Sequence, residues 1–265
     1  MAAFELLNMP SDEVRTVIDR MPVAVIPFGS VEQHGKHLPC GTDVFAVEVV
    51  AKALAEKLGC LFVPFGPYGI TYPHVGLPGS ISLSRATFEG LITDIVTELM
   101  GSGVKLFIMV NWHEAHQPSL NAVCMELQFK HGIKFVIAHA HFVAQRIYAP
   151  HGGRLTHAGS IETLAVMAHD PKLYHPEKIT PPQRTEKAEA LDAMRRSYEI
   201  YGFVTNVLDL SKDGWYGDPT WATSERAKDF ADTISGEIAK RIDEVWQTLG
   251  VDRPNPVLTK SAQRS

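Results

Sequence analysis

Short apolar runs alternate along this chain with segments of helical period, and this alternation constrains the fold more than any other feature. The runs, which are rich in valine, isoleucine and phenylalanine, predict buried strands at Val23–Phe28, Leu61–Phe65, Lys105–Asn111 and Phe135–Ala140. The segments between them predict helices at Val44–Leu58, Ala86–Met100 and Ser119–Lys130. Strands joined by helices of this length form right-handed βαβ crossovers, so we predict an α/β fold with a mainly parallel sheet.

The second half of the chain has helical period at three further places, Ile161–Ala168, Glu186–Tyr198 and Glu225–Leu249. A length of 265 residues suits one large domain, so we expect a single domain over residues 1–265. The tail after Gly250 is polar, and we expect it to fray.

Composition excludes several functional classes. The formal charge of −5, from 25 basic and 30 acidic side chains, favours neither nucleic acid nor an anionic membrane as a partner. The first ten residues contain no apolar run, which argues against a signal peptide or a membrane span. Three widely spaced cysteines fit a reducing compartment. We therefore expect a cytoplasmic protein that acts on a small molecule.

Polar side chains gather where the predicted strands end. Glu32 and His34 follow the first strand, and Asp43 opens the next helix. His113 follows the third strand directly, and Glu162 lies beyond the fourth. Ligands of an open parallel sheet bind at the carboxyl ends of its strands, so these side chains should meet at one edge. Zn²⁺ and Mn²⁺ accept mixed histidine and carboxylate ligands, which makes a metal site the leading hypothesis.

Each of these residues also has a purely structural explanation. Asp43 could serve as a helix N-cap, and Glu32 and His34 could belong to a hydrogen-bonded polar loop. Glu162 in the first turn of a helix is favoured by the helix dipole alone. His157 could be an acid/base group or a turn residue. The neighbours Glu114 and His116 could be ligands, proton carriers or exposed loop residues. We expect His37, His139, His141 and His151 to have structural roles or to support the ligands rather than to be ligands themselves.

Other catalytic motifs are missing from the sequence. It contains no G-x-S-x-G nucleophile elbow, no phosphate-binding G-x-x-x-x-G-K-[ST] loop and no dinucleotide-binding G-x-G-x-x-G. The segment His113–His116 is one residue too short for H-E-x-x-H. Metal-assisted chemistry is what remains.

The segment that begins at Pro27 reads PFGSVEQHGKHLPCGTD. It closely resembles the first signature of the creatininase (creatinine amidohydrolase) family. The similarity runs in order from about Met21 to Ala227. It is carried by Pro27–Asp43, Gly76–Leu83, Asn111–His113, His157–Thr163 and Gly217–Pro219.

The resemblance implies a three-layer sandwich, a homo-oligomer that is often a hexamer, and two divalent metals per chain (Zn, Mn or Fe). One metal would be held by Glu32, Asp43 and His113, and the other by His34 and the bridging Asp43. Creatinine-hydrolysing members add a glutamate two residues after the strand-end histidine, where this chain has Ala115. We expect Glu162 rather than Glu114 to take its place.

The substrate pocket departs from the creatinine-hydrolysing pattern. Those members place tryptophan before the His-Ala-Gly motif, whereas the segment Ala149–Thr156 has no aromatic residue. Glu114 and His116 could make a more polar pocket. We expect the substrate to lie between Tyr72, His74, Trp112 and Arg154, with His157 and Glu114 as catalytic groups.

Three functions are therefore open. The first is hydrolysis of a small amide C–N bond, with His157 protonating the leaving group. The second uses the same site to cleave a C–C bond in a cyclic polyol diketone of the inosose type. The third is a catalytically silent oligomeric binding protein that kept the fold.

Overall fold

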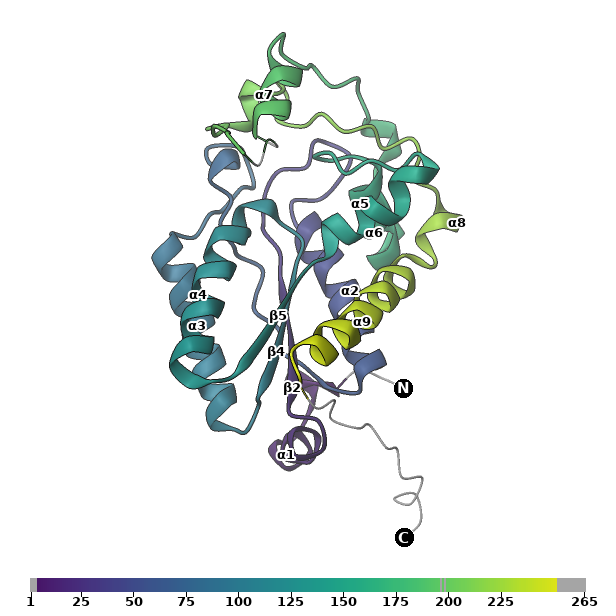
Figure 1. Cartoon of the computed structure of the whole chain (residues 1–265). Coiled ribbons are helices and arrows are strands. Elements are labelled where there is room, and N and C mark those ends of the chain that lie inside the picture. Colours follow the sequence, from purple (N-terminus) through teal and green to yellow (C-terminus); the bar gives the residue numbers. More distant parts are fainter. Residues whose placement is uncertain (1–3, 196, 198, 252–265) are drawn as a thin grey trace.

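Five parallel strands form one central sheet in the order β1-β3-β2-β4-β5 (Figure 1). This computed structural model describes residues 4–195, 197 and 199–251. The strands are β1 (Phe4–Glu5), β2 (Val23–Phe28), β3 (Leu61–Phe62), β4 (Leu106–Asn111) and β5 (Lys134–His139). Helices cover both faces of the sheet, so the predicted three-layer α/β fold is confirmed.

Most of the described helices form two layers, one on each face of the sheet, and α7 lies beyond the carboxyl ends of the strands (Figure 1). Their bounds are α1 (Ser11–Arg20), α2 (Thr42–Leu58), α3 (Arg85–Gly101), α4 (Gln117–His131), α5 (Ala140–Tyr148), α6 (Ser160–His169), α7 (Ala188–Arg195), α8 (Ser224–Ala227) and α9 (Phe230–Thr248). Short 3-10 helices lie at Leu6–Asn8, Tyr72–His74, Glu114–His116, Ala149–His151, Pro171–Leu173, Pro176–Lys178 and Val207–Asp209.

The apolar runs of β2 and β4 are continuous because both strands are buried on both faces. In β2, Val23 and Val25 pack into the cluster that contains α2, α6 and α9. The alternate residues Ala24, Ile26 and Phe28 pack into the opposite cluster, with α1, α3 and α4. Figure 1 shows these two helical layers on either side of the sheet.

Several predicted elements differ in extent. The predicted strand Leu61–Phe65 was too long, because β3 pairs only as far as Phe62 and Pro64 has no N–H to continue the ladder. The predicted helix Glu225–Leu249 is two helices, since the chain leaves helical geometry at Asp229 before α9 begins. Residues 196 and 198 of the predicted helix Glu186–Tyr198, and the tail from residue 252, lie outside the described residues.

The order of the strands changes direction between β2 and β4, which makes this place the topological switch point of the sheet. The chain leaves β2 through α2 to reach β3 on one side, then returns through α3 on the opposite face to β4 on the other side. Phe28 and Asn111, the last residues of β2 and β4, are register partners. Ligands of such sheets bind where the two chain paths diverge. The segments after Phe28 and Asn111 therefore begin at the expected ligand site.

The part of the chain that the structure describes has no helix with both the length and the apolar character needed to cross a membrane.

Candidate metal centre

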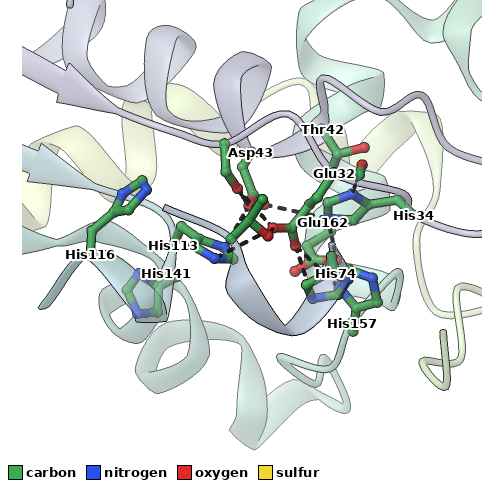
Figure 2. Close-up of polar contacts among 12 residues, drawn as sticks. Glu32, His34, Thr42, Asp43, His74, His113, His116, His141, His157 and Glu162 are labelled. Carbon is green, nitrogen blue, oxygen red and sulfur yellow. Dashed lines mark hydrogen bonds and ion pairs between the residues drawn. The ribbon is translucent and has the colours of Figure 1, made fainter. Parts of the chain in front are cut away.

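The five metal-ligand candidates converge at this switch point (Figure 2). Glu32 and His34 follow β2, and Asp43 lies in the first turn of α2. His113 follows β4, and Glu162 lies in the first turn of α6. The carboxylates of this group line a cavity of about 310 Å³. The predicted convergence is thus present in the structure.

The first cluster consists of Glu32, Asp43 and His113, whose ligand atoms lie within 4.8 Å of one another. His113 Nδ1 lies 2.9 Å from Asp43 Oδ2, and its Nε2 lies 3.4 Å from Glu32 Oε2. The hydroxyl of Ser30 lies 2.7 Å from Asp43 Oδ2 and 3.0 Å from Glu32 Oε2. Thr71 donates a further hydrogen bond to Glu32. These contacts fix both carboxylates in place.

The second cluster consists of His34, Asp43 and Glu162, also within 4.8 Å. His34 Nδ1 lies 3.0 Å from the carbonyl oxygen of Glu32, which can only accept, so Nδ1 carries the proton. Nε2 lies 3.4 Å from Asp43 Oδ1 and 3.5 Å from Glu162 Oε2. Ala158 adopts a left-handed conformation (φ 56°) and donates its N–H to Glu162 Oε2 at 2.6 Å. With Nδ1 held by the carbonyl oxygen, Nε2 is the nitrogen that binds a metal once it has given up its proton.

Asp43 belongs to both clusters and is not a helix cap. The N-cap of α2 is Gly41, and no side chain caps that helix end. The Asp43 carboxylate instead contacts His113, His34 and Ser30, and its residue is only 2% exposed. The structural explanation for Asp43 therefore does not hold.

The electrostatics of the cluster favour bound cations. Burial and the neighbouring Asp43 raise the pKa of Glu162 to about 8, although His34 opposes the shift. Burial lowers the pKa of His34, but Glu162 and Asp43 outweigh it and raise that pKa to about 10. Three carboxylates thus share a buried space. The Nε2 atoms of His34 and His113 are buried there without a hydrogen-bond partner among the described residues. This donor set fits two divalent cations.

His157 lies beside the clusters with one nitrogen held in place. Its Nε2 lies 2.8 Å from the carbonyl oxygen of Gln33 and 3.0 Å from the side-chain nitrogen of the same residue. The shorter contact, to an oxygen that can only accept, favours a proton on Nε2. Its Nδ1 lies 3.7 Å from Glu32 Oε1, and His157 also groups with Glu32 and His34 within 4.8 Å. Burial and the neighbouring His74 and His34 hold the pKa of His157 well below its ordinary value. A neutral imidazole whose Nδ1 is turned toward Glu32 therefore faces the cluster.

The predicted substrate residues divide into two groups. His74 and Trp112 line the cavity, and so does the predicted catalytic residue Glu114. Tyr72 is 52% exposed and accepts a hydrogen bond from the N–H of Arg85. Arg154 is exposed as well, and neither Tyr72 nor Arg154 lines this cavity. Tyr72 lies in the same 3-10 helix as His74, but its side chain is turned toward solvent, as is that of Arg154.

His116 and His141 have roles that the sequence left open or did not predict. Ile70 donates its N–H to His116 Nε2, and His116 Nδ1 lies 3.0 Å from Asn111 Oδ1. Both ring nitrogens of His116 are thus engaged inside the protein. His141, predicted to be structural, lines the cavity. Ser30 and Gln33 were also not predicted, although both flank the ligands within the first motif.

Comparison with known proteins identifies the family. The family model described as creatinine amidohydrolase matches residues 7–242. The chain belongs to the creatininase family. A 3-dehydro-scyllo-inosose hydrolase of Thermotoga maritima is 24% identical to it, over 94% of this chain and 86% of the relative. A mycofactocin precursor peptide peptidase of Mycolicibacterium smegmatis is 28% identical, over 88% of this chain and 89% of the relative.

Solved creatininase structures share the fold of this chain. A manganese form has a TM-score of 0.72 at 22% identity and covers 92% of this chain and 98% of that one. A Zn–Zn form of a creatininase mutant has a TM-score of 0.71 at 22% identity, over 92% and 99%. The family thus contains hydrolases that differ in substrate.

Proposed function

We propose that this creatininase-family chain is a metal-dependent hydrolase that cleaves the C–N bond of a small amide, linear or cyclic. The observation that carries the proposal is the pair of ligand clusters that share Asp43, next to the neutral His157. Glu32, Asp43 and His113 would hold one cation, and His34, Asp43 and Glu162 the other. The manganese and Zn–Zn forms of similar creatininase structures support this assignment. When bound, two such cations lower the pKa of a water from ~15.7 toward ~7 and polarise a carbonyl.

The residues of the chain supply the proton transfer. His157 Nδ1 faces the cluster as a lone pair, so it can accept a proton from the attacking water. The water oxygen bonds to the amide carbon, the C–N bond breaks, and His157 returns the proton to the leaving nitrogen. The low pKa keeps His157 neutral at the start of the cycle, so that its Nδ1 is able to accept a proton.

A second candidate is hydrolysis of a C–C bond in a cyclic polyol diketone. The inosose hydrolase of Thermotoga maritima supports it, because that relative covers 94% of this chain. The absence of a carboxylate at Ala115, which lines the cavity, also sets this chain apart from creatinine-hydrolysing members. Attack of water on a ketone needs the same ligands and the same proton carrier.

Turnover assays on the purified chain test both candidates. The protein is loaded with Zn²⁺, Mn²⁺ or Fe²⁺ and assayed against a panel of amides that includes creatinine, and against keto-inositols. We expect hydrolysis of one class that disappears after chelation and returns when metal is restored. Activity that persists in protein stripped of metal would contradict the mechanism. Metal-loaded protein that hydrolyses neither class would favour the silent binding protein.

A further inference from the structure

Two buried polar atoms beside the metal centre have no hydrogen-bond partner in the part of the chain that the structure describes. Trp112 follows β4 and His141 lies in the first turn of α5, and both line the cavity that contains Glu32 and Asp43. The residues are 2% and 1% exposed. Among the described residues, neither Trp112 Nε1 nor His141 Nε2 has a hydrogen-bond partner. A buried polar group without a hydrogen-bond partner is destabilising, so such an atom calls for a partner such as a water, an ion or a ligand.

The two atoms have opposite hydrogen-bonding character. The indole Nε1–H of Trp112 can only donate. His141 Nδ1 lies 3.2 Å from the carbonyl oxygen of Asn111, so the proton is on Nδ1 and Nε2 presents a lone pair. Burial lowers the pKa of His141 to about 4, which keeps the ring neutral at pH 7. The cavity wall therefore offers one donor and one acceptor.

The two rings are also neighbours. Their centroids lie 6.5 Å apart at an interplanar angle of 68°. In Figure 2, His141 lies on the His113 side of the cluster, away from His34 and His157. The Trp112 and His141 pair is thus separate from the proton carrier His157 and shares the cavity with it.

The chemistry of the pair suits a group that both accepts and donates a hydrogen bond, and a hydroxyl is the smallest such group. A hydroxyl accepts from a donor and donates to an acceptor through a single oxygen. A carboxylate has no proton for His141 Nε2, and an ammonium has no lone pair for Trp112 Nε1. We propose that Trp112 Nε1 and His141 Nε2 form a hydroxyl-binding subsite, and that the substrate carries a hydroxyl group near the carbonyl that is attacked. This inference rests on the proposed hydrolase function and holds for C–N and C–C cleavage alike.

Binding measurements with two probes test the subsite. Calorimetry compares scyllo-inosose, a hydroxylated cyclic ketone, with cyclohexanone, which lacks the hydroxyls. Trp112→Phe removes the indole N–H and keeps an aromatic ring. His141→Asn keeps a donor near Nδ1 and removes the Nε2 acceptor. Trp246→Phe is the matched control, because Trp246 is also 2% exposed and belongs to the same core cluster but does not line the cavity.

We expect wild-type protein to bind scyllo-inosose more tightly than cyclohexanone. Trp112→Phe and His141→Asn should each weaken binding of scyllo-inosose by about tenfold and leave cyclohexanone binding unchanged. Trp246→Phe should bind both probes as wild type does. Equal binding of the two probes by wild type, or unchanged scyllo-inosose binding in both cavity variants, would overturn the subsite.

Metal content separates this result from the proposed function. Each titration is run on metal-loaded and on chelated protein, with the metal measured in the same samples. If Trp112→Phe or His141→Asn keeps its metal but no longer prefers scyllo-inosose over cyclohexanone, the result supports the subsite and leaves the hydrolase mechanism untouched. A wild-type chain that binds no metal but keeps the preference would overturn the hydrolase mechanism and leave the subsite in place.

Discussion

Glu162 and Glu114 are the two carboxylates that could take the ligand position where this chain has Ala115. Glu162 Oε2 lies 3.5 Å from His34 Nε2, and Glu162 completes the second ligand cluster, to which Glu114 does not belong. We predict that Glu162→Gln lowers the metal content from about two to about one per chain, because an amide is a weaker ligand than a carboxylate. Elemental analysis of the purified variant measures this.

Glu114→Gln is the matched control for that experiment. It is the same substitution in the same cavity, and it should leave both metals bound. A Glu162→Gln protein that retains both metals, combined with loss of metal in Glu114→Gln, would transfer the ligand role to Glu114.

His157 carries the predicted proton transfer. We expect His157→Ala to keep its metal and to lose roughly 10²–10⁴-fold in kcat, the usual contribution of a positioned acid/base group. Steady-state kinetics on the substrate found in the turnover assays measures this. His175→Ala serves as the control, since the His175 side chain is 43% exposed and does not line the cavity. Full turnover in His157→Ala would assign the proton carrier to another group.

At the scale of elements, the approach of α2 to the end of β2 sets the position of Asp43. A Cβ atom on Gly29 would lie 2.7 Å from Val44 Cα and 2.8 Å from the carbonyl carbon of Asp43. These are backbone atoms, so Gly29→Ala must push the first turn of α2 away from the sheet. We predict a loss of about 1–3 kcal/mol in the free energy of unfolding, together with weaker metal binding.

Denaturant unfolding of chelated protein and metal titration of folded protein measure the two effects separately. Gly90→Ala is the control, because Gly90 lies within α3 and its added Cβ would meet nothing within 4 Å. That change should stabilise the protein by about 0.5–1 kcal/mol. If Gly29→Ala were as stable as wild type and bound as much metal, the close approach of Gly29 to the first turn of α2 would not determine the position of Asp43.

The sequence predicted the long elements well and the short or merged ones poorly. β2 and β4 are buried on both faces, so their apolar runs stand out. α1 was not predicted, because only Val17 and Ile18 are buried in it. α5 was missed for another reason. It begins at Ala140 directly after β5, with no glycine or proline to mark the boundary.

The sequence predicted those residues of the candidate site that follow the ends of strands. Glu32, His34 and His113 follow β2 and β4 directly, so the parallel sheet alone brings them together. Tyr72 lies in the short 3-10 helix Tyr72–His74 and Arg154 in the loop before α6, and no sequence period fixes where these side chains point. The cavity role of His141 depends on the carbonyl of Asn111, which only the pairing of β4 with β5 brings close.

At the scale of the whole molecule, we propose the homo-oligomer that family resemblance implies. Large apolar side chains are exposed on α4 and beside the cavity, among them Met125 at 73%, Phe129 at 91% and Phe203 at 85%. Surfaces of this kind are often covered in closed assemblies. We predict a hexamer in light scattering of the purified chain. A monomer at micromolar concentration would contradict this assembly.

At the carboxyl end of the sheet, the carboxylate of Asp43 belongs to both ligand clusters. The metal content of the chain therefore tests the proposed two-metal centre most directly. Elemental analysis of freshly purified wild-type protein should give about two divalent metals per chain. Asp43→Asn should give close to none, because Asp43 belongs to both ligand clusters. A folded wild-type chain that binds no Zn²⁺, Mn²⁺ or Fe²⁺ would contradict the central claim.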